Sequence, residues 1–157
     1  MSTNGFRLPE PYARFSVSLA ATGALITDAD GLVLLVRPHH NPYWTFVGGM
    51  VDVGEAPHEA CAREIKEEIG LDLSVGRLLV TDWAPPSDRR PLPIAYYVFD
   101  AGTVTETITP QSDEIGEFAF LPPEEATGRL APNVAYRLGQ ALRSRADGRT
   151  VYSPQAE

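Results

Sequence analysis

Three observations predict a single α/β domain. The chain has 157 residues, a length typical of one domain. Hydrophobic residues make up 43% of it and charged residues 22%, as in soluble globular chains. Runs of strand-forming residues alternate with segments whose apolar residues recur at helical spacing. We expect the domain to cover residues 15–148, between a flexible N-terminal arm at 1–14 and a C-terminal tail at 149–157.

The first elements are expected to be strands. Residues 15–26 are apolar with many small side chains, and residues 32–36 form a short run rich in leucine and valine. The sequence DADG at 28–31 between them is typical of a turn. These two strands are therefore predicted to pair as a hairpin. A proline-containing loop follows, and it leads on to Thr45, Phe46 and Val47 and then to Gly48 and Gly49.

A helix is predicted at 57–69. Pro57 is suited to the first helical turn, and Gly70 is placed to end the helix. At about 100° per residue, four small or apolar residues fall on one face, which we expect to pack in the core: Cys61, Ala62, Ile65 and Ile69.

The second half of the chain contains three expected strands and two expected helices. The strands are at 71–83, 93–99 and 117–121. A proline-rich loop at 84–92 separates the first two. A short helix is expected around PPEEA, followed by a longer one at 132–145 with apolar residues at i, i+4 and i+8, namely Val134, Leu138 and Leu142.

Composition excludes several classes of function. With 21 acidic and 13 basic residues, the net charge of −8 disfavours binding to a nucleic acid polymer. The single cysteine, Cys61, excludes an internal disulfide. The sequence has no run of about 20 apolar residues that would span a membrane, and its first residues do not resemble a signal peptide. We therefore expect a cytoplasmic protein.

Glu64, Glu67 and Glu68 carry the main chemical signal, because positions i, i+3 and i+4 place their carboxylates on one face of the helix. Like charges at this spacing repel, and we expect Arg63 and Lys66 to project toward the opposite, solvent side. A hard divalent cation would relieve the repulsion. The alternative is a solvated acidic face. Two features favour metal binding: Glu68 is expected to be half buried, and a glycine-marked loop precedes the helix.

Residues 49–71 resemble the Nudix hydrolase signature, G-x5-E-x7-R-E-U-x-E-E-x-G-U, where U is aliphatic. Every position is met, by Gly49, Glu55, Arg63, Glu64, Ile65, Glu67, Glu68, Gly70 and Leu71. One departure is Val47 where the family often has proline before the two glycines. The resemblance implies a three-layer α/β/α sandwich, in which a mixed β-sheet is covered by the 57–69 helix on one side and the 132–145 helix on the other.

The resemblance also implies a metal-dependent pyrophosphohydrolase. Glu64, Glu67 and Glu68 would bind Mg²⁺ or Mn²⁺, while Arg63 would pair with Glu55 and fix the loop. Glu114 would complete the metal shell or act as base, with Asp113 and Glu117 as competitors. The general base is left open between Glu68 and Glu114. The favoured substrate is a nucleoside diphosphate linked to another group, such as ADP-ribose. Alternatives are a nucleoside triphosphate pyrophosphohydrolase and a non-catalytic nucleotide sensor.

The sequence gives weaker signals for substrate contacts. Pro86 lies fifteen residues after Leu71, as in family members that resemble ADP-ribose hydrolases. Aromatic side chains could stack a base, and arginines could bind phosphate. The candidates are Arg37, Trp44, Phe46, Trp83 and Arg89. The expected partner is a small molecule, with neither a nucleic acid polymer nor a membrane involved. The oligomeric state is left between monomer and homodimer.

Overall fold

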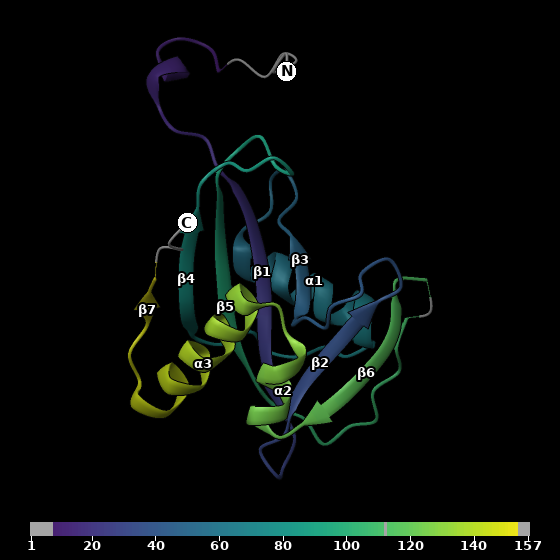
Figure 1. The fold of residues 1–157 in the computed structure, drawn as a ribbon. Coiled ribbons are helices and arrows are strands. Elements are labelled where there is room, and N and C mark those ends of the chain that lie inside the picture. Colours follow the sequence, from purple (N-terminus) through teal and green to yellow (C-terminus); the bar gives the residue numbers. More distant parts are fainter. Residues whose placement is uncertain (1–7, 112, 154–157) are drawn as a thin grey trace.

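The computed structural model describes residues 8–111 and 113–153. Within them a mixed sheet is flanked by helices on both faces (Figure 1). The strands are β1 (Leu19–Thr27), β2 (Val33–Pro38), β3 (Val47–Met50), β4 (Leu78–Ala84), β5 (Ile94–Thr103), β6 (Ile115–Leu121) and β7 (Val151–Tyr152). The helices are the short 3-10 helix η1 (Tyr12–Arg14) and the α-helices α1 (Pro57–Ile69), α2 (Pro123–Arg129) and α3 (Pro132–Asp147).

Strand β1 lies at the centre of the sheet. The strand order is β6-β2-β1-β5-β4-β7, and β3 pairs with β1 outside this path. The β1–β5 and β4–β7 pairs are parallel, and the other pairs are antiparallel. The predicted mixed sheet is therefore confirmed.

The predicted hairpin between β1 and β2 is present only at its base. The two strands pair at Thr27 and Val33 and then separate. They separate because the rest of β1 is occupied by β3, with Ala21 opposite Met50 and Ala24 opposite Val47, while β2 pairs with β6.

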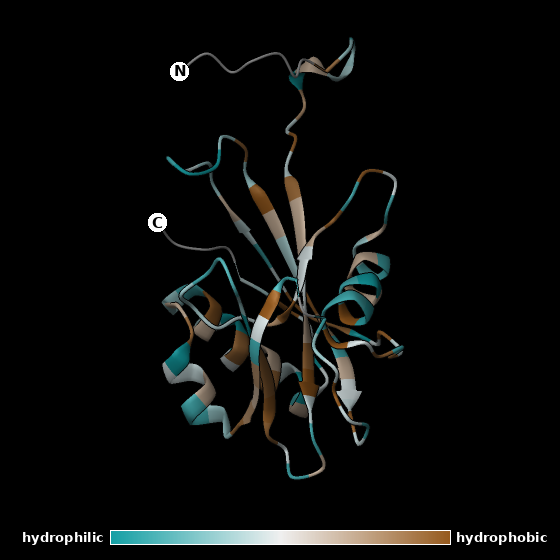
Figure 2. Cartoon of the chain, turned by 90° about the vertical axis from the view of Figure 1, so that its right-hand side faces the viewer, coloured by the Kyte–Doolittle hydropathy of each residue, from teal (hydrophilic) through white to brown (hydrophobic). Residues whose placement is uncertain are grey.

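Two apolar clusters, one on each face of the sheet, form the core. On one face, Cys61, Ile65 and Ile69 of α1 pack against β1, β2 and β3. On the other, α2 and α3 cover the sheet, and Leu138 is fully buried there. Figure 2 shows hydrophobic strands between helices that carry hydrophilic residues. The three-layer arrangement, with α1 on one side and α3 on the other, is confirmed.

Three segments differ from expectation. The strand expected at 71–83 begins only at Leu78. Gly76 and Arg77 exchange backbone hydrogen bonds with Asp100 of β5 just before it, while Leu71 and Val75 pack against the α1 cluster. In the expected tail, β7 pairs with β4. In the expected arm, the described residues include η1, which buries no side chain. Among the described residues, no helix has the length and apolar character needed to cross a membrane.

Candidate active site

A loop at 51–56 connects β3 to α1 and fixes where the helix begins. The loop closes on itself, because the Asp52 amide donates to the Glu55 carboxylate at 3.0 Å. Pro57 occupies the first turn, and the Ala56 amide donates to Glu59 Oε2 at 2.8 Å. Gly70 ends the helix in the left-handed conformation with φ 73°, as its place in the sequence predicted.

Gly49 of β3 lies against the Glu64 side chain of α1. A Cβ atom at this position would lie 2.4 Å from Glu64 Oε1, which is far inside contact distance. Only glycine allows the backbone to approach the carboxylate so closely. The Gly49 of the signature thus sets the spacing between β3 and the acidic face of α1.

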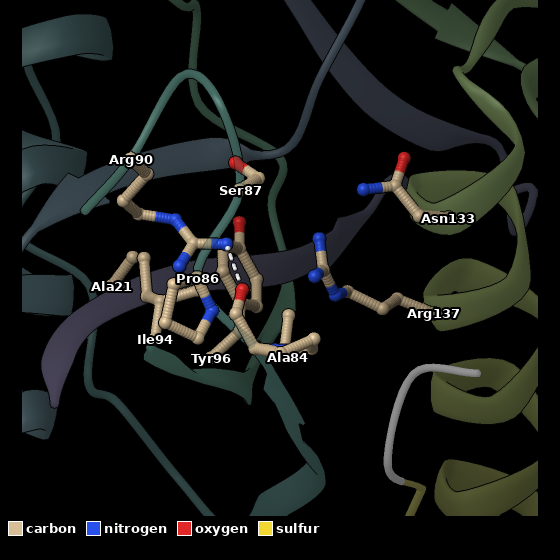
Figure 3. A pocket seen from close by; sticks show the side chains of 10 residues that line it. Ala21, Ala84, Pro86, Ser87, Arg90, Ile94, Tyr96, Asn133 and Arg137 are labelled. Atoms are coloured by element: carbon tan, nitrogen blue, oxygen red, sulfur yellow. Dashed lines mark hydrogen bonds between the residues drawn. The ribbon is translucent and has the colours of Figure 1, made fainter. Parts of the chain in front are cut away.

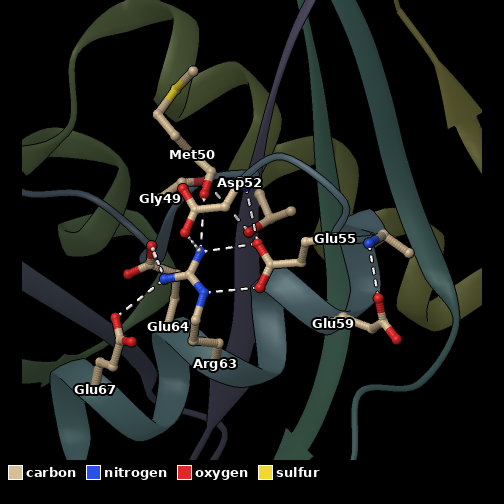
Figure 4. A network of polar contacts seen from close by, with 10 residues as sticks. Gly49, Met50, Asp52, Glu55, Glu59, Arg63, Glu64 and Glu67 are labelled. Carbon is tan, nitrogen blue, oxygen red and sulfur yellow. Dashed lines mark hydrogen bonds and ion pairs between the residues drawn. The ribbon is translucent and has the colours of Figure 1, made fainter.

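Arg63 and Glu55 form the predicted ion pair across the loop (Figure 4). Arg63 Nε donates to Glu55 Oε1 at 2.8 Å, and Nη2 donates to Glu55 Oε2 at 3.1 Å. Nη2 also donates to the carbonyl oxygen of Met50 at 3.1 Å, which ties the end of β3 to the helix. The hydrogen bond from Arg63 lowers the pKa of Glu55, so this carboxylate stays ionised.

The expectation that Arg63 points away from the glutamate cluster is wrong. Its Nη1 donates to Glu64 at 3.0 Å and to Glu67 at 3.1 Å (Figure 4). The direction of the Cα–Cβ bond suggested the flank of the helix, but the long side chain folds back along it. Arg63 therefore offsets part of the repulsion among the three clustered glutamates. Lys66 does point to solvent, where it pairs with Asp72 at 3.1 Å.

Glu68 is the most buried of the three clustered glutamates, at 6% exposure. The Gly48 amide donates to its Oε2 at 3.2 Å. Burial raises the pKa of Glu68 to about 8, against the effect of that hydrogen bond and with further contributions from Glu64, Glu114 and Glu67. Burial likewise raises the pKa of Glu64. Both carboxylates are thus held in an environment that disfavours their negative charge.

Glu114 lies beside the helix, in the loop before β6. Together with Glu67, Gln111 and Asp113 it lines a cavity of about 300 Å³. Its negative charge contributes to the raised pKa values of Glu64 and Glu68. The competing residue Glu117 lies further along β6 and pairs with Arg37 at 2.9 Å. The structure therefore brings Glu114 and Asp113, rather than Glu117, to the signature segment at 49–71, here called the box.

The carboxylates on and beside α1 are of the chemical type that binds hard divalent cations. Three of them, on Glu64, Glu68 and Glu114, are close enough for their charges to disfavour one another, and carboxylate oxygens are the ligands that Mg²⁺ and Mn²⁺ prefer. Among the described residues, however, no three such side chains converge as a ready-made metal site. Arg63 engages Glu64 and Glu67 instead, so metal binding requires these side chains to rearrange.

A second cavity, of about 680 Å³, lies on the α3 side of the sheet (Figure 3). Its polar lining residues include Tyr96, Asn133 and Arg137, none of which the sequence singled out. Arg137 pairs with Asp82 at 2.5 Å, and both side chains are buried. Residues 55 positions apart in the sequence form this pair, and no motif connects them.

The candidate substrate contacts are dispersed. Phe46 is only 1% exposed and packs in the core, so the expectation that it could stack a base is corrected. Arg129 lies over the Trp44 ring, Trp83 is 38% exposed on β4, and Arg37 pairs with Glu117. Arg89 lies at the tip of the turn that Ser87 and Arg90 close with mutual backbone hydrogen bonds, and Arg90 rather than Arg89 lines the larger cavity.

Comparison with known proteins identifies the family of this chain. The family model described as the NUDIX domain matches residues 17–143. A MutT-like protein from Streptomyces ambofaciens is 30% identical over 80% of this chain and 77% of its own length. An ADP-ribose pyrophosphatase from Methanocaldococcus jannaschii is 40% identical over 41% of this chain and 40% of its own.

The fold is likewise shared with solved structures. A MutT protein from Methanosarcina mazei Go1 superposes with a TM-score of 0.72 over 83% of this chain and 96% of its own, at 23% identity. This chain spans only 47% and 40% of the length of two curated relatives that it matches.

Proposed function

The chain belongs to the NUDIX domain family, and on that premise we propose that it is a metal-dependent pyrophosphohydrolase. Its substrate class is a nucleoside diphosphate linked to another group, with ADP-ribose as the first compound to test. One observation carries the proposal: Glu67 shares a cavity with Glu114, and Glu114 is near enough to the buried Glu68 and the half-buried Glu64 for its charge to raise their pKa values, a repulsion that a divalent cation would relieve. A relative named an ADP-ribose pyrophosphatase supports the substrate class.

In this proposal, Glu64, Glu67 and Glu68 hold Mg²⁺ or Mn²⁺, with Glu114 completing the shell or taking the proton of the attacking water. The cation, when bound, supplies charge neutralisation of the diphosphate and acidification of a bound water. Arg63 would retain its hydrogen bonds to Glu55 and to the Met50 carbonyl if Glu64 and Glu67 turned toward the cation. These bonds would hold the loop in place. Glu68 and Glu114 remain the two candidate bases.

The larger cavity would accept a terminal group of the substrate. Its wall includes Ala21, which pairs with Met50, and the Met50 carbonyl is bound by Arg63. The cavity wall is therefore connected through β3 to the arginine that binds the glutamates. A nucleoside diphosphate derivative with its diphosphate at the box could extend over this strand. A volume of about 680 Å³ is in the usual range for small-molecule sites.

The proposal includes a small-molecule partner rather than a nucleic acid polymer, which the net charge of −8 supports. It also includes a cytoplasmic location. The alternatives for the oligomeric state are a monomer and a homodimer. A second candidate function, hydrolysis of nucleoside triphosphates, is favoured by relatives named CTP pyrophosphohydrolase and 8-oxo-dGTP diphosphatase. A non-catalytic sensor is the third, but a sensor has no need for repelling carboxylates.

The test is incubation with Mg²⁺ and ADP-ribose, with AMP release as the readout. A panel of nucleoside diphosphate derivatives and triphosphates run in parallel separates the first two candidates. Release of AMP or its counterpart from the diphosphate derivatives supports the proposal, whereas pyrophosphate release from triphosphates alone supports the second candidate. Binding without turnover of any compound would favour the sensor.

Calorimetry gives a second test. A non-hydrolysable ADP-ribose analogue should bind weakly in EDTA and much more tightly with Mg²⁺, because the acidic site repels a bare diphosphate. By linkage, the analogue should raise the affinity for Mg²⁺ by the same factor. Equal affinity with and without metal would contradict the proposed metal bridge.

A further inference from the structure

A buried arginine in the larger cavity has no role in the chemistry at the box. The Arg137 side chain is 8% exposed, and its partner Asp82 is 1% exposed. Nε donates to Asp82 at 2.5 Å and Nη2 at 3.3 Å. The guanidinium carbon lies 4.1 Å from the centre of the Tyr96 ring, within range of a cation–π contact. An ion pair and an aromatic ring thus hold the guanidinium in one orientation.

One nitrogen of this guanidinium remains available. Arg137 Nη1 has no hydrogen-bond partner among the described residues. It is also not sealed from solvent, since Arg145 Nε is the only fully buried side-chain nitrogen or oxygen atom without a partner in the described chain. Figure 3 shows the group pointing into the cavity, toward Asn133 and Ser87. Nη1 carries two N–H donors. The cavity therefore presents a fixed pair of donors that no group described in the protein uses.

The remaining lining determines what these donors can meet. Ala21, Pro86 and Ile94 provide apolar surface suited to a flat ring. The second arginine, Arg90, is engaged with the carbonyl oxygens of Leu92 and Pro85 and so fixes the wall. No Asp or Glu of the described chain is among the lining residues. A ligand oxygen is thus complementary to the cavity, whereas a ligand amine would face a cation and its N–H groups.

We propose that Arg137 is a specificity-determining residue that selects substrates whose nucleobase carries a carbonyl oxygen, such as guanine, hypoxanthine or uracil, over adenine. The inference rests on the proposed function and refines it, because it ranks keto-base compounds above ADP-ribose. Arginine pairs with the carbonyl and ring nitrogen of a 6-oxopurine, while adenine places an amino group at the position of that carbonyl. Asp82 and Tyr96 act as positioning residues for Arg137.

The test compares IMP with AMP, which differ by a carbonyl in place of an amino group. Titration calorimetry with Mg²⁺ should show IMP binding roughly tenfold more tightly than AMP to the wild-type protein. In the double variant Asp82→Asn/Arg137→Met the ratio should fall to within about threefold. The double variant is used because Arg137→Met alone removes the arginine that neutralises the buried Asp82 carboxylate.

The matched control is Arg143→Met, an exposed arginine on the same helix that does not line the cavity. It should keep the wild-type ratio. Equal binding of IMP and AMP to the wild type, or a ratio that survives loss of Arg137, would overturn the inference. Binding is measured without turnover, so absence of hydrolysis would overturn the proposed function while leaving this ratio readable. If hydrolysis occurs, the preference should appear in KM rather than in kcat.

Discussion

Arg63 and Arg137 lie on opposite sides of the sheet, and each is held by carboxylates, but in opposite ways. The Arg63 side chain is 28% exposed and contacts four carboxylates, those of Asp52, Glu55, Glu64 and Glu67. The Arg137 side chain is 8% exposed and contacts the carboxylate of Asp82. Arg63 can lose one of its carboxylate partners and still be bound by the others. Arg137, in contrast, has one carboxylate partner, in a buried ion pair.

The charge balance differs as well. Four carboxylates around one arginine leave an excess of negative charge at the box, which suits a cation. The Asp82–Arg137 pair is neutral as a whole, so it leaves directed hydrogen-bond donors without a net charge. One region is therefore suited to attract metal and the other to discriminate between groups of similar size.

The largest expected effect is on stability and comes from breaking the ion pair between Asp82 and Arg137. Arg137→Met should lower the free energy of unfolding by about 3–5 kcal/mol, because it removes the arginine partner of the buried Asp82 carboxylate. Asp82→Asn/Arg137→Met should recover most of this loss, and Arg63→Met should cost less than Arg137→Met. Urea denaturation of the three variants without metal measures the differences. Equal losses for Arg63→Met and Arg137→Met would contradict the contrast between the two regions.

Removing charge from the box should affect activity instead. Glu67→Gln and Glu68→Gln should each reduce kcat/KM at saturating Mg²⁺ at least tenfold, a barrier change of about 1.4 kcal/mol, while the fold stays intact. Initial rates on the best substrate of the panel, with circular dichroism as the control for folding, measure this. Rates within about threefold of wild type for both variants would show that these glutamates do not bind the metal.

The metal-free protein should lose stability as pH rises because of Glu68. Its pKa in the folded state is about 8 against an ordinary 4.5, so its contribution to stability is fully present below pH 4.5 and is lost as pH rises toward 8. In EDTA, Glu68→Gln should therefore melt a few degrees above wild type at pH 8.5, with a smaller difference at pH 5. Scanning calorimetry at both pH values checks this, and parallel curves would contradict it.

The smallest effect is expected at Lys66–Asp72, an ion pair at the end of α1. The two side chains are 67% and 82% exposed. A double-mutant cycle with Lys66→Met and Asp72→Asn should give a coupling energy below about 1 kcal/mol that falls further in 0.5 M NaCl, as is usual for exposed pairs. A larger coupling energy that does not change with salt would contradict the idea that solvent exposure sets the strength of the ion pairs in this protein.

These regions also differ in how far the sequence predicts them. The spacing of Gly49, Glu55 and Gly70 predicts the loop and the ends of α1, because a local motif fixes local geometry. The reach of Arg63 to Glu67 was missed, since helical angles describe Cβ directions and not the path of a long side chain. Asp82 and Arg137 meet only through the tertiary fold, so no pattern within either segment indicates the pair.

The core shows the same limit. Phe46 follows a loop, and so the sequence suggests that a ligand can reach it. In the structure the preceding residue, Thr45, forms a β-bridge with Val36, and the Phe46 ring is buried in the core. The strand expected at 71–83 fails in its first part because propensity does not reveal whether a partner strand is present.

The position of β1 has a consequence for how the protein is made. Its parallel partner β5 is 75 residues further along, since Leu19 pairs with Ile94. A ribosome must therefore extend the chain past residue 103 before the central pair of the sheet can close. Until then the apolar face of α1, including Ile65, lacks its complete sheet. Nascent chains that stop before β5 should be targets for chaperones and proteases, because long-range pairing of this kind is slow and exposes apolar surface.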